Sequence, residues 1–274
     1  MRYLRILYEK VLNLFAILIV KVVGKFPRKG MGLTALNNGI LKEKSIIFTK
    51  AGALVFHTPN WVTRFRVETL FVKEPETIDW IESFDDTSVF YDIGANIGIY
   101  SIYAAKLKSC KVLAFEPSAP NQEMLVRNVL ANSLSENVVI VPIGLSDTTT
   151  IKPMHMDINS FFWGGAHNSL GINLDETGSP LRNSISYQLP AMQLDFVREI
   201  FKLPTPDHIK VDVDGLEKWI LFGAKNALKT TKSVMVEIDS QNQESLNAIV
   251  KIMMVNGLIL KAQYLNNVLF ERVV

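Results

Sequence analysis

Short apolar runs separated by longer amphipathic stretches dominate the chain from residue 88 onward. The β-branched and aromatic content of five of these runs predicts buried strands at 89–93, 111–115, 138–141, 208–215 and 233–238. The fourth run carries acidic residues at its carboxyl end. Stretches with helical spacing lie between or after them, at 97–107, 121–132, 216–228 and 243–256. Strands that alternate with helices predict an α/β fold with a mostly parallel sheet.

The carboxyl-terminal segment departs from this alternation. Two strand-like runs, 258–265 and 268–272, flank Asn266-Asn267, which predicts a closing antiparallel hairpin with the Asn pair at a tight turn. The predicted sheet therefore has seven strands, with helices on both faces. A dinucleotide-binding domain would usually end in a parallel strand instead.

Apolar positions in residues 1–24 recur at spacings of three and four, which predicts an amphipathic helix. The positions are Leu4, Leu7, Val11, Leu14, Leu18 and Val22. The apolar run 11–20 ends at Lys21 and is short for a membrane span, which needs about 20 residues. No small-residue cleavage site follows, so we expect a cytoplasmic protein. Three interpretations of this helix remain. It packs on the domain or on a second subunit, or it lies on a membrane surface with its basic residues on lipid phosphates. A full membrane span is the third.

The composition of residues 25–40 is typical of a linker, so we assign 1–44 to an N-terminal helix and linker. Two strand-like runs, 45–48 and 53–58, flank Lys50-Ala51-Gly52 and predict a small hairpin around these three residues. Helices are predicted at 61–71 and 76–84, with Pro75 between them. We expect residues 45–87 to cap the ligand pocket of a domain that spans 45–274, with its catalytic core at 88–274.

Residues 147–190 are polar, rich in Gly and without clear periodicity. A long irregular segment inside an enzyme is usually a lid or a substrate loop. A plain surface insertion is the alternative.

Composition excludes several classes of site. The single cysteine, Cys110, excludes an intrachain disulfide and a cysteine zinc cluster, and we expect it in the core. The four histidines form no H-E-x-x-H and no i, i+4 pair, which argues against a transition-metal site. The net charge of +2 hides seven basic residues in 1–30 against Glu9 alone, so the rest of the chain is mildly acidic. We therefore expect no nucleic-acid partner.

A glycine turn follows the first predicted strand of the core. The run Asp92-Ile93-Gly94-Ala95-Asn96-Ile97-Gly98 passes from a strand into a helix whose free N–H groups point at the turn. Glu116 ends the next strand, 24 positions after Asp92, where a carboxylate is expected to bind ribose hydroxyls. These features predict a Rossmann-like sheet that binds a nucleoside cofactor.

Two cofactor classes use this geometry, nicotinamide dinucleotides and S-adenosylmethionine. Asn96 occupies the position of the middle glycine of the dinucleotide pattern, and Asp92 would repel a pyrophosphate. A carboxylate suits the cationic sulfonium and amino groups of S-adenosylmethionine. The residues therefore favour a methyltransferase. A nicotinamide-binding protein and a catalytically inactive cofactor-binding scaffold remain as alternatives.

The chain resembles the FkbM-type methyltransferases, S-adenosylmethionine-dependent enzymes of the class I fold. The matching motifs are Glu74-Pro75-Glu76-Thr77, the glycine turn from Tyr91 to Gly98, Ala114-Phe115-Glu116-Pro117, Asn121, Asn128, Asn132, residues 209–217, Leu221-Phe222-Gly223-Ala224 and Glu237. The match covers roughly 45–240. Asn96 follows the family's own pattern, whereas Asp214 stands where many members carry Glu. The resemblance implies methyl transfer to oxygen, often a hydroxyl of a sugar, polyketide or other secondary metabolite, with no fixed acceptor; residues 1–44 lie outside it.

The expected cofactor residues are Asp92, Gly94, Ala95, Asn96, Gly98, Tyr100, Glu116, Pro117, Gly144, Glu74 and Thr77. The turn would hold the methionine portion, Glu116 the ribose, and residues 142–146 the adenine.

Deprotonation of an acceptor hydroxyl needs a general base, and Asp212 and Asp214 lead for this role because neighbouring carboxylates raise one another's pKa. Alternatively, the pair binds a divalent cation with Glu237 or Asp239, or one of them caps the helix near Leu216. We predict no resident metal. The candidates for acceptor contact are His167, Asn168, Ser169 and Glu237. His167 is also a catalytic candidate. His208 is expected to be structural. The expected partner is a small-molecule or glycan acceptor.

Overall fold

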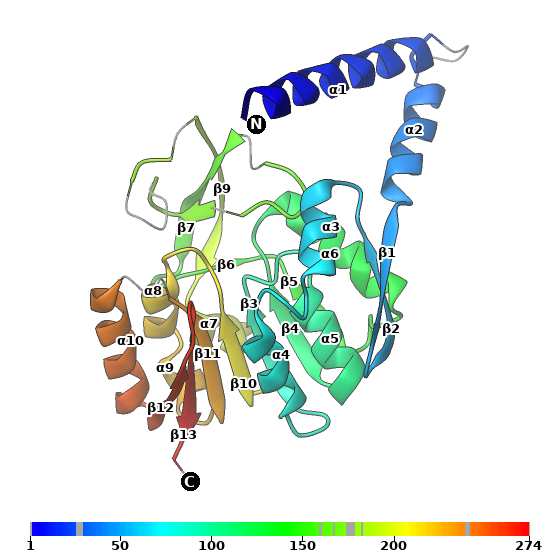
Figure 1. The fold of residues 1–274 in the computed structure, drawn as a ribbon. Helices are drawn as coiled ribbons and strands as arrows, with labels where there is room; N and C mark the ends of the chain where they lie inside the picture. The colour runs from blue at the N-terminus through cyan, green and yellow to red at the C-terminus, as the bar shows by residue number, and fades with distance from the viewer. Residues whose placement is uncertain are drawn as a thin grey trace.

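The computed structural model describes residues 2–25, 30–158, 161–166, 168–173, 179–181, 183–238 and 242–273. Its largest element is a seven-stranded sheet with the order β12-β13-β11-β10-β3-β4-β5 (Figure 1). The strands are β3 (Val89–Ile93), β4 (Lys111–Phe115), β5 (Val138–Val141), β10 (His208–Val211), β11 (Ser233–Glu237), β12 (Leu258–Gln263) and β13 (Asn267–Arg272). All neighbours pair in parallel except β13, which is antiparallel to both β11 and β12. The predicted α/β fold is confirmed.

Helices cover both faces of this sheet. Because successive side chains of a strand point to opposite faces, both sets are buried. Phe90 of β3 joins one apolar cluster, whereas Tyr91 and Ile93 join the other. The first cluster includes residues of α3 (Trp61–Glu68), α4 (Pro75–Glu82), α5 (Ile99–Lys108) and α6 (Ala119–Ala131). The second includes residues of α7 (Leu194–Ile200), α8 (Glu217–Phe222), α9 (Lys225–Leu228) and α10 (Gln243–Val255). Cys110 is buried in the first cluster, as predicted.

The predicted hairpin of residues 45–58 is present as β1 (Lys44–Thr49) and β2 (Gly52–His57). Two side chains of α6 hold it on the domain. Asn128 Oδ1 accepts from the His57 N–H at 2.7 Å, and Asn132 Oδ1 accepts from the Val55 N–H at 2.9 Å. These amides satisfy part of the open edge of β2.

The segment predicted to be irregular contains most of a four-stranded sheet, β6-β9-β7-β8, so the prediction that 147–190 is irregular was wrong. Its role as a lid or substrate loop, or as a surface insertion, stays a prediction. The strands of this sheet are β6 (Gly144–Leu145), β7 (Thr150–Asp157), β8 (Asn168–Leu170) and β9 (Ser184–Met192). Only Met154 and Met156 of β7 are buried. Two buried positions are too few to give the sequence a recognisable strand pattern. β7 pairs with β9 across a long connection, and such pairing leaves no local pattern.

Three further predictions fail locally. Residues 31–41, predicted as linker, form α2 (Met31–Leu41), a helix with only Leu41 buried. The single helix predicted at 216–228 is broken into α8 and α9 at Gly223, where a Cβ would lie 2.4 Å from the Ser146 carbonyl oxygen. β12 ends at Gln263 and β13 begins at Asn267, so the Asn pair is not a two-residue turn. The helix α7 was not predicted at all.

The predicted N-terminal helix is confirmed as α1 (Arg2–Val23), which contacts α2 and projects with it from the body of the fold (Figure 1). Apolar side chains from Val11 to Val22 are largely exposed, so packing of α1 on its own domain is not seen in the described part of the chain. No helix among the described residues is long and apolar enough to cross a membrane. Contact with a second subunit or a membrane surface, and the boundary at residue 44, stay predictions.

Candidate active site

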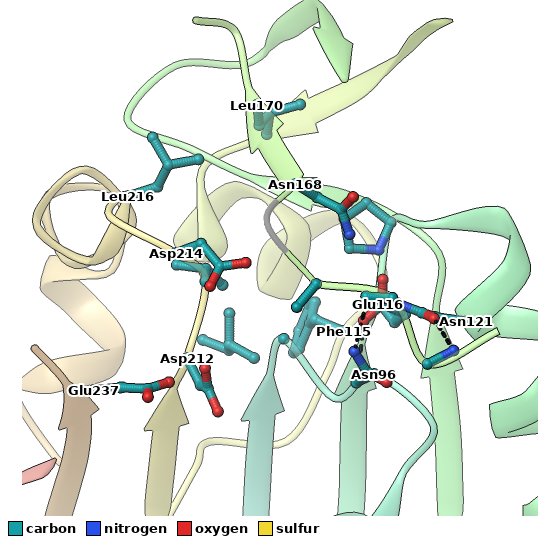
Figure 2. Close-up of a pocket in the computed structure, with 18 of the residues that line it drawn as sticks. Asn96, Phe115, Glu116, Asn121, Asn168, Leu170, Asp212, Asp214, Leu216 and Glu237 are labelled. Carbon is teal, nitrogen blue, oxygen red and sulfur yellow. Dashed lines mark hydrogen bonds between the residues drawn. The ribbon is translucent and has the colours of Figure 1, made fainter. Parts of the chain in front are cut away.

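A pocket of about 620 Å³ opens at the carboxyl ends of β3, β4, β10 and β11. This edge is where open α/β sheets bind their ligands, and the volume is that of a small-molecule site. Its lining includes Gly94, Asn96, Glu116, Pro117, Gly144, Asn168, Asp212, Asp214 and Glu237, all of them predicted site residues. In Figure 2 Asn96, Glu116 and Asn121 lie on one side, and Asp212, Asp214 and Glu237 on the other.

The glycine turn between β3 and α5 has the backbone that its sequence predicts. Gly94 has a φ of +85°, and a Cβ there would lie 1.8 Å from the Asp212 carbonyl oxygen. Gly98, the N-cap of α5, has a φ of +83°, and its Cβ would meet the Leu125 side chain at 2.3 Å. The two glycines therefore allow the turn to approach the end of β10 and the helix α6 closely.

Glu116 is held at the end of β4 by two backbone donors. Its Oε2 accepts from the Asn96 N–H at 2.7 Å, and its Oε1 accepts from the Ser118 N–H at 2.8 Å. Only 4% of the residue is exposed, and this burial raises the pKa of Glu116 to about 7. A carboxylate has about four acceptor positions, so each oxygen can still accept a hydroxyl donor from a ligand.

The opposite end of the pocket carries Asp212 and Glu237, whose carboxyl groups share a hydrogen bond. Burial and the charge of Asp212 raise the pKa of Glu237 to about 10. Burial also disfavours the Asp212 anion, but the Lys210 ammonium at 2.6 Å and the Glu237 hydrogen bond hold the pKa of Asp212 well below its usual range. These opposite shifts favour a proton on Glu237 over a proton on Asp212.

Asp214 lines the same end of the pocket in a loop where it has a φ of +55° and Gly215 a φ of +98°. An aspartate tolerates this left-handed conformation better than most residues. The loop precedes α8, whose N-cap is Leu216 without a side-chain cap hydrogen bond. Neither Asp212 nor Asp214 therefore occupies the N-cap position of α8.

The metal alternative finds no support within the described ranges, which contain no group of three or more His, Cys, Asp or Glu side chains that could hold a metal ion. Asp239, considered as a third ligand, lies outside the described residues, as does His167.

Several predicted cofactor residues lie behind the pocket wall instead of in it. Asp92 is 2% exposed, and its Oδ2 accepts from the Ser101 hydroxyl at 2.6 Å. Burial raises the pKa of Asp92 to about 6. The pocket lining also omits Ala95, Gly98, Tyr100, Glu74, Thr77 and Ser169. Of these, Glu74 and Tyr100 surround Lys210, and the Thr77 hydroxyl donates to Glu74 at 3.1 Å.

The structural expectation for His208 is met. Its Nδ1 lies 2.8 Å from the Ser233 hydroxyl, and its ring stacks on Phe84 with centroids 3.8 Å apart. Burial lowers the pKa of His208 to about 4.

A segment that we name the strap, residues 161–166, closes one side of the pocket. Asn96 Nδ2 and Asn121 Nδ2 donate to the Gly165 carbonyl at 3.0 and 3.1 Å. Asn121 Oδ1 accepts from the Gly164 N–H at 2.9 Å, and Arg66 Nε donates to the Gly164 carbonyl at 2.8 Å. The strap thus connects α3, α6 and the glycine turn.

Sequence reasoning assigned no role to Lys210 or to the pocket-lining residues Trp61, Phe65, Arg66 and Lys73. A lysine within an otherwise apolar strand was visible in the sequence and could have identified Lys210. The segment 45–87 was expected to cap the pocket, and α3 does line it, but no sequence pattern singled out the individual residues that do so.

Comparison with known proteins identifies the family of this chain. The profile of the FkbM methyltransferase domain matches residues 92–264. The hexuronic acid methyltransferase AglP of Haloferax volcanii is 26% identical over 207 residues, which cover 74% of this chain and 78% of AglP. The AMB antimetabolite synthetase AmbE of Pseudomonas aeruginosa is 28% identical over 204 residues, 64% of this chain but only 9% of AmbE.

Among solved structures, the FkbM methyltransferase of Methylobacillus flagellatus is 15% identical with a TM-score of 0.47. The similarity covers 69% of this chain and 44% of that one. The match to the family profile extends over more than half of the chain and includes Glu116, Asp212, Asp214 and Glu237. The chain therefore belongs to the FkbM methyltransferase domain family and is an S-adenosylmethionine-dependent methyltransferase.

Proposed function

We propose that this enzyme transfers a methyl group to an oxygen atom of a sugar, within a glycan or a small molecule. The observation that carries the proposal is that one pocket has acidic side chains at both ends. Glu116 lies at one end, at the position suited to ribose hydroxyls, and three acidic residues, Asp212, Asp214 and Glu237, lie at the other. A cofactor and an acceptor can therefore share a single cavity. The similarity to a hexuronic acid methyltransferase supports the choice of a sugar.

The residues present fit S-adenosylmethionine. Glu116 retains acceptor capacity for two ribose hydroxyls, and Gly94 and Gly144 line the pocket without side chains of their own. Two buried acceptors without a partner, Asn96 Oδ1 and Asn168 Oδ1, belong to residues of the pocket wall. Buried polar atoms are normally hydrogen-bonded, so these oxygens suit the amino and hydroxyl donors of a bound nucleoside. When bound, the cofactor supplies an electrophilic methyl group on a positively charged sulfur.

The chain's own residues have two tasks in this reaction. They hold the acceptor oxygen about 3 Å from the methyl carbon and in line with the sulfur, and they accept the hydroxyl proton. We assign the proton to Asp214, which lines the acidic end of the pocket. Asp212 is a weaker base because Lys210 holds its pKa low, and the raised pKa of Glu237 favours its protonated form. The ionised Asp212 instead balances positive charge near the reacting atoms.

An acceptor panel with methyl-labelled S-adenosylmethionine tests the proposal. We would compare methyl β-glucuronide, methyl β-glucoside and a phenolic acceptor without a sugar, and locate the label by mass spectrometry. Transfer to a sugar oxygen supports the proposal. Labelling of the phenol alone, or of nitrogen in an amino-sugar control, would contradict it.

A further inference from the structure

Lys210 is a lysine enclosed in the centre of the sheet. It is the third residue of β10, between β3 and β11, and only 1% of it is exposed. Its Nζ lies 2.6 Å from Asp212 Oδ2, 3.6 Å from Glu74 Oε2 and 5.0 Å from the centroid of the Tyr100 ring. A charged lysine is rarely buried without partners, because leaving water disfavours its ionised form.

The two carboxylates that contact Lys210 differ in what else holds them. Glu74 also accepts from Lys73 Nζ at 3.1 Å and from the Thr77 hydroxyl at 3.1 Å. Asp212 has the shorter contact with Lys210, and its other neighbour is the carboxyl group of Glu237. Lys210 is therefore the close cationic contact of Asp212, whereas Glu74 has a second lysine.

Asp212 also differs in where it points. Its side chain is 26% exposed and lines the pocket, whereas the side chain of Glu74 is 7% exposed and does not. The enclosed lysine therefore reaches the ligand through Asp212, the pocket-lining carboxylate that it contacts most closely.

We propose that Lys210 is a positioning residue: its ammonium, 2.6 Å from Asp212 Oδ2, holds the Asp212 carboxylate charged and directed into the pocket, where the cationic sulfur of the cofactor meets a fixed negative charge. The proposal rests on the function proposed above. Lys210 touches neither ligand; it acts through Asp212.

The electrostatic surroundings of Asp212 come from five other parts of the fold. The titratable groups that act on Asp212 or feel its charge are Lys210, Glu237 of β11, Lys73 and Glu74 before α4, Asp92 of β3, Tyr100 of α5 and Glu217 of α8. Five of these are acids, and only Lys210 and Lys73 are cations. Lys73 is half-exposed, so solvent screens it. Removal of Lys210 leaves Asp212 among buried acids, which favours its protonation.

The test compares two cofactor forms that differ in charge at sulfur. Isothermal titration of S-adenosylmethionine and S-adenosylhomocysteine between pH 5.5 and 8 gives the ratio of their dissociation constants. Contributions from Glu116 act on both ligands and cancel in this ratio. In the wild type we expect the preference for the sulfonium form to change less than threefold across the range. In Lys210→Met we expect it to fall about tenfold toward pH 5.5, as Asp212 gains a proton.

Two further variants separate positioning from folding. Lys218→Met removes a lysine that lies over the Trp219 ring outside the pocket and serves as the matched control. The double variant Lys210→Met/Glu74→Gln removes the buried Glu74 charge that would otherwise keep only the half-exposed Lys73 as its cation. It carries the test where the single variant does not fold. We expect the double variant to keep the altered pH profile.

Each outcome decides the matter. A wild-type profile in folded Lys210→Met, or its recovery in the double variant, would overturn the proposal, because Lys210 would then serve only Glu74. An altered profile in both variants but not in Lys218→Met supports it. A wild-type protein that binds neither cofactor form would instead overturn the proposed function itself.

Discussion

The two ends of the pocket hold their carboxylates by different means. Glu116 is fixed by backbone N–H groups of Asn96 and Ser118, so its position depends on the path of the main chain. Asp212 is fixed by side chains, Lys210 and Glu237, so its charge depends on where protons reside. The cofactor end should therefore be most sensitive to changes of backbone geometry, and the acidic end to changes of charge that leave the backbone intact.

The largest effect is expected from Gly94→Ala. The new Cβ would meet the Asp212 carbonyl oxygen, and φ is +85°, so both sterics and backbone strain oppose the change. We expect a loss of about 3 kcal/mol or more in the free energy of unfolding, measured by urea denaturation. Gly52→Ala is the control: its φ is +91° but no atom lies within 4 Å, so about 1 kcal/mol is expected. Equal losses in the two variants would refute the close approach of the turn to β10.

The next effect is on cofactor affinity. In Glu116→Gln an amide group replaces one carboxylate oxygen and faces a backbone N–H that needs an acceptor. We expect S-adenosylhomocysteine to bind about thirtyfold more weakly at pH 8, or about 2 kcal/mol, by calorimetry. Glu136→Gln, at an exposed position between α6 and β5, should bind as the wild type does. Unchanged affinity in Glu116→Gln would remove the ribose role from Glu116.

A pH dependence follows from the same residue. Burial raises the pKa of Glu116 to about 7, so below that pH the free protein holds a proton that must leave before both oxygens can accept. Affinity for S-adenosylhomocysteine should therefore rise with pH, by up to tenfold per unit below about pH 7, and level off above it. Calorimetry in two buffers of different ionisation enthalpy would detect the released proton, and Glu116→Gln should release none. An affinity that falls as pH rises to 7 would have the wrong sign for this account.

The smallest effect concerns Asn96, whose side chain joins the cofactor turn to the strap. Asn96→Gly suits the φ of +51° but removes the hydrogen bond to Gly165. We expect cofactor affinity to fall about fivefold, because the Asn96 Oδ1 acceptor is lost as well, while the amide of Gly164 exchanges its hydrogen faster. Unaltered exchange at Gly164 would show that Asn121 and Arg66 hold the strap without Asn96.

The same contrast explains what the sequence could predict. Asp92, Gly94, Gly98 and Glu116 belong to a strand, a turn and the next strand, where local pattern and spacing determine the geometry. The sheet of β6 to β9 depends on pairings such as Thr150 with Ala191, which no local pattern reveals. The break at Gly223 depends on the approach of Ser146 from another part of the chain.

The acidic residues of the site show the same difference between what is local in sequence and what depends on the fold. The carboxylates at the strand ends were predicted together, but their protonation depends on neighbours distant in sequence. Asp92 was expected in the pocket, yet the Ser101 hydroxyl binds it within the protein interior. Glu74, more than 130 positions from Lys210, helps to retain the lysine charge that keeps Asp212 ionised.

The measurement that tests the central claim most directly pairs cofactor binding with turnover in Asp214→Asn. Asparagine accepts the φ of +55° at this position, so the variant changes the carboxylate without straining the loop. With methyl β-glucuronide and labelled S-adenosylmethionine, we predict wild-type affinity for S-adenosylhomocysteine and a rate of methyl transfer lowered about a hundredfold. A variant that retains the wild-type rate, or that loses cofactor binding together with activity, would contradict a pocket with separate cofactor and proton-accepting ends.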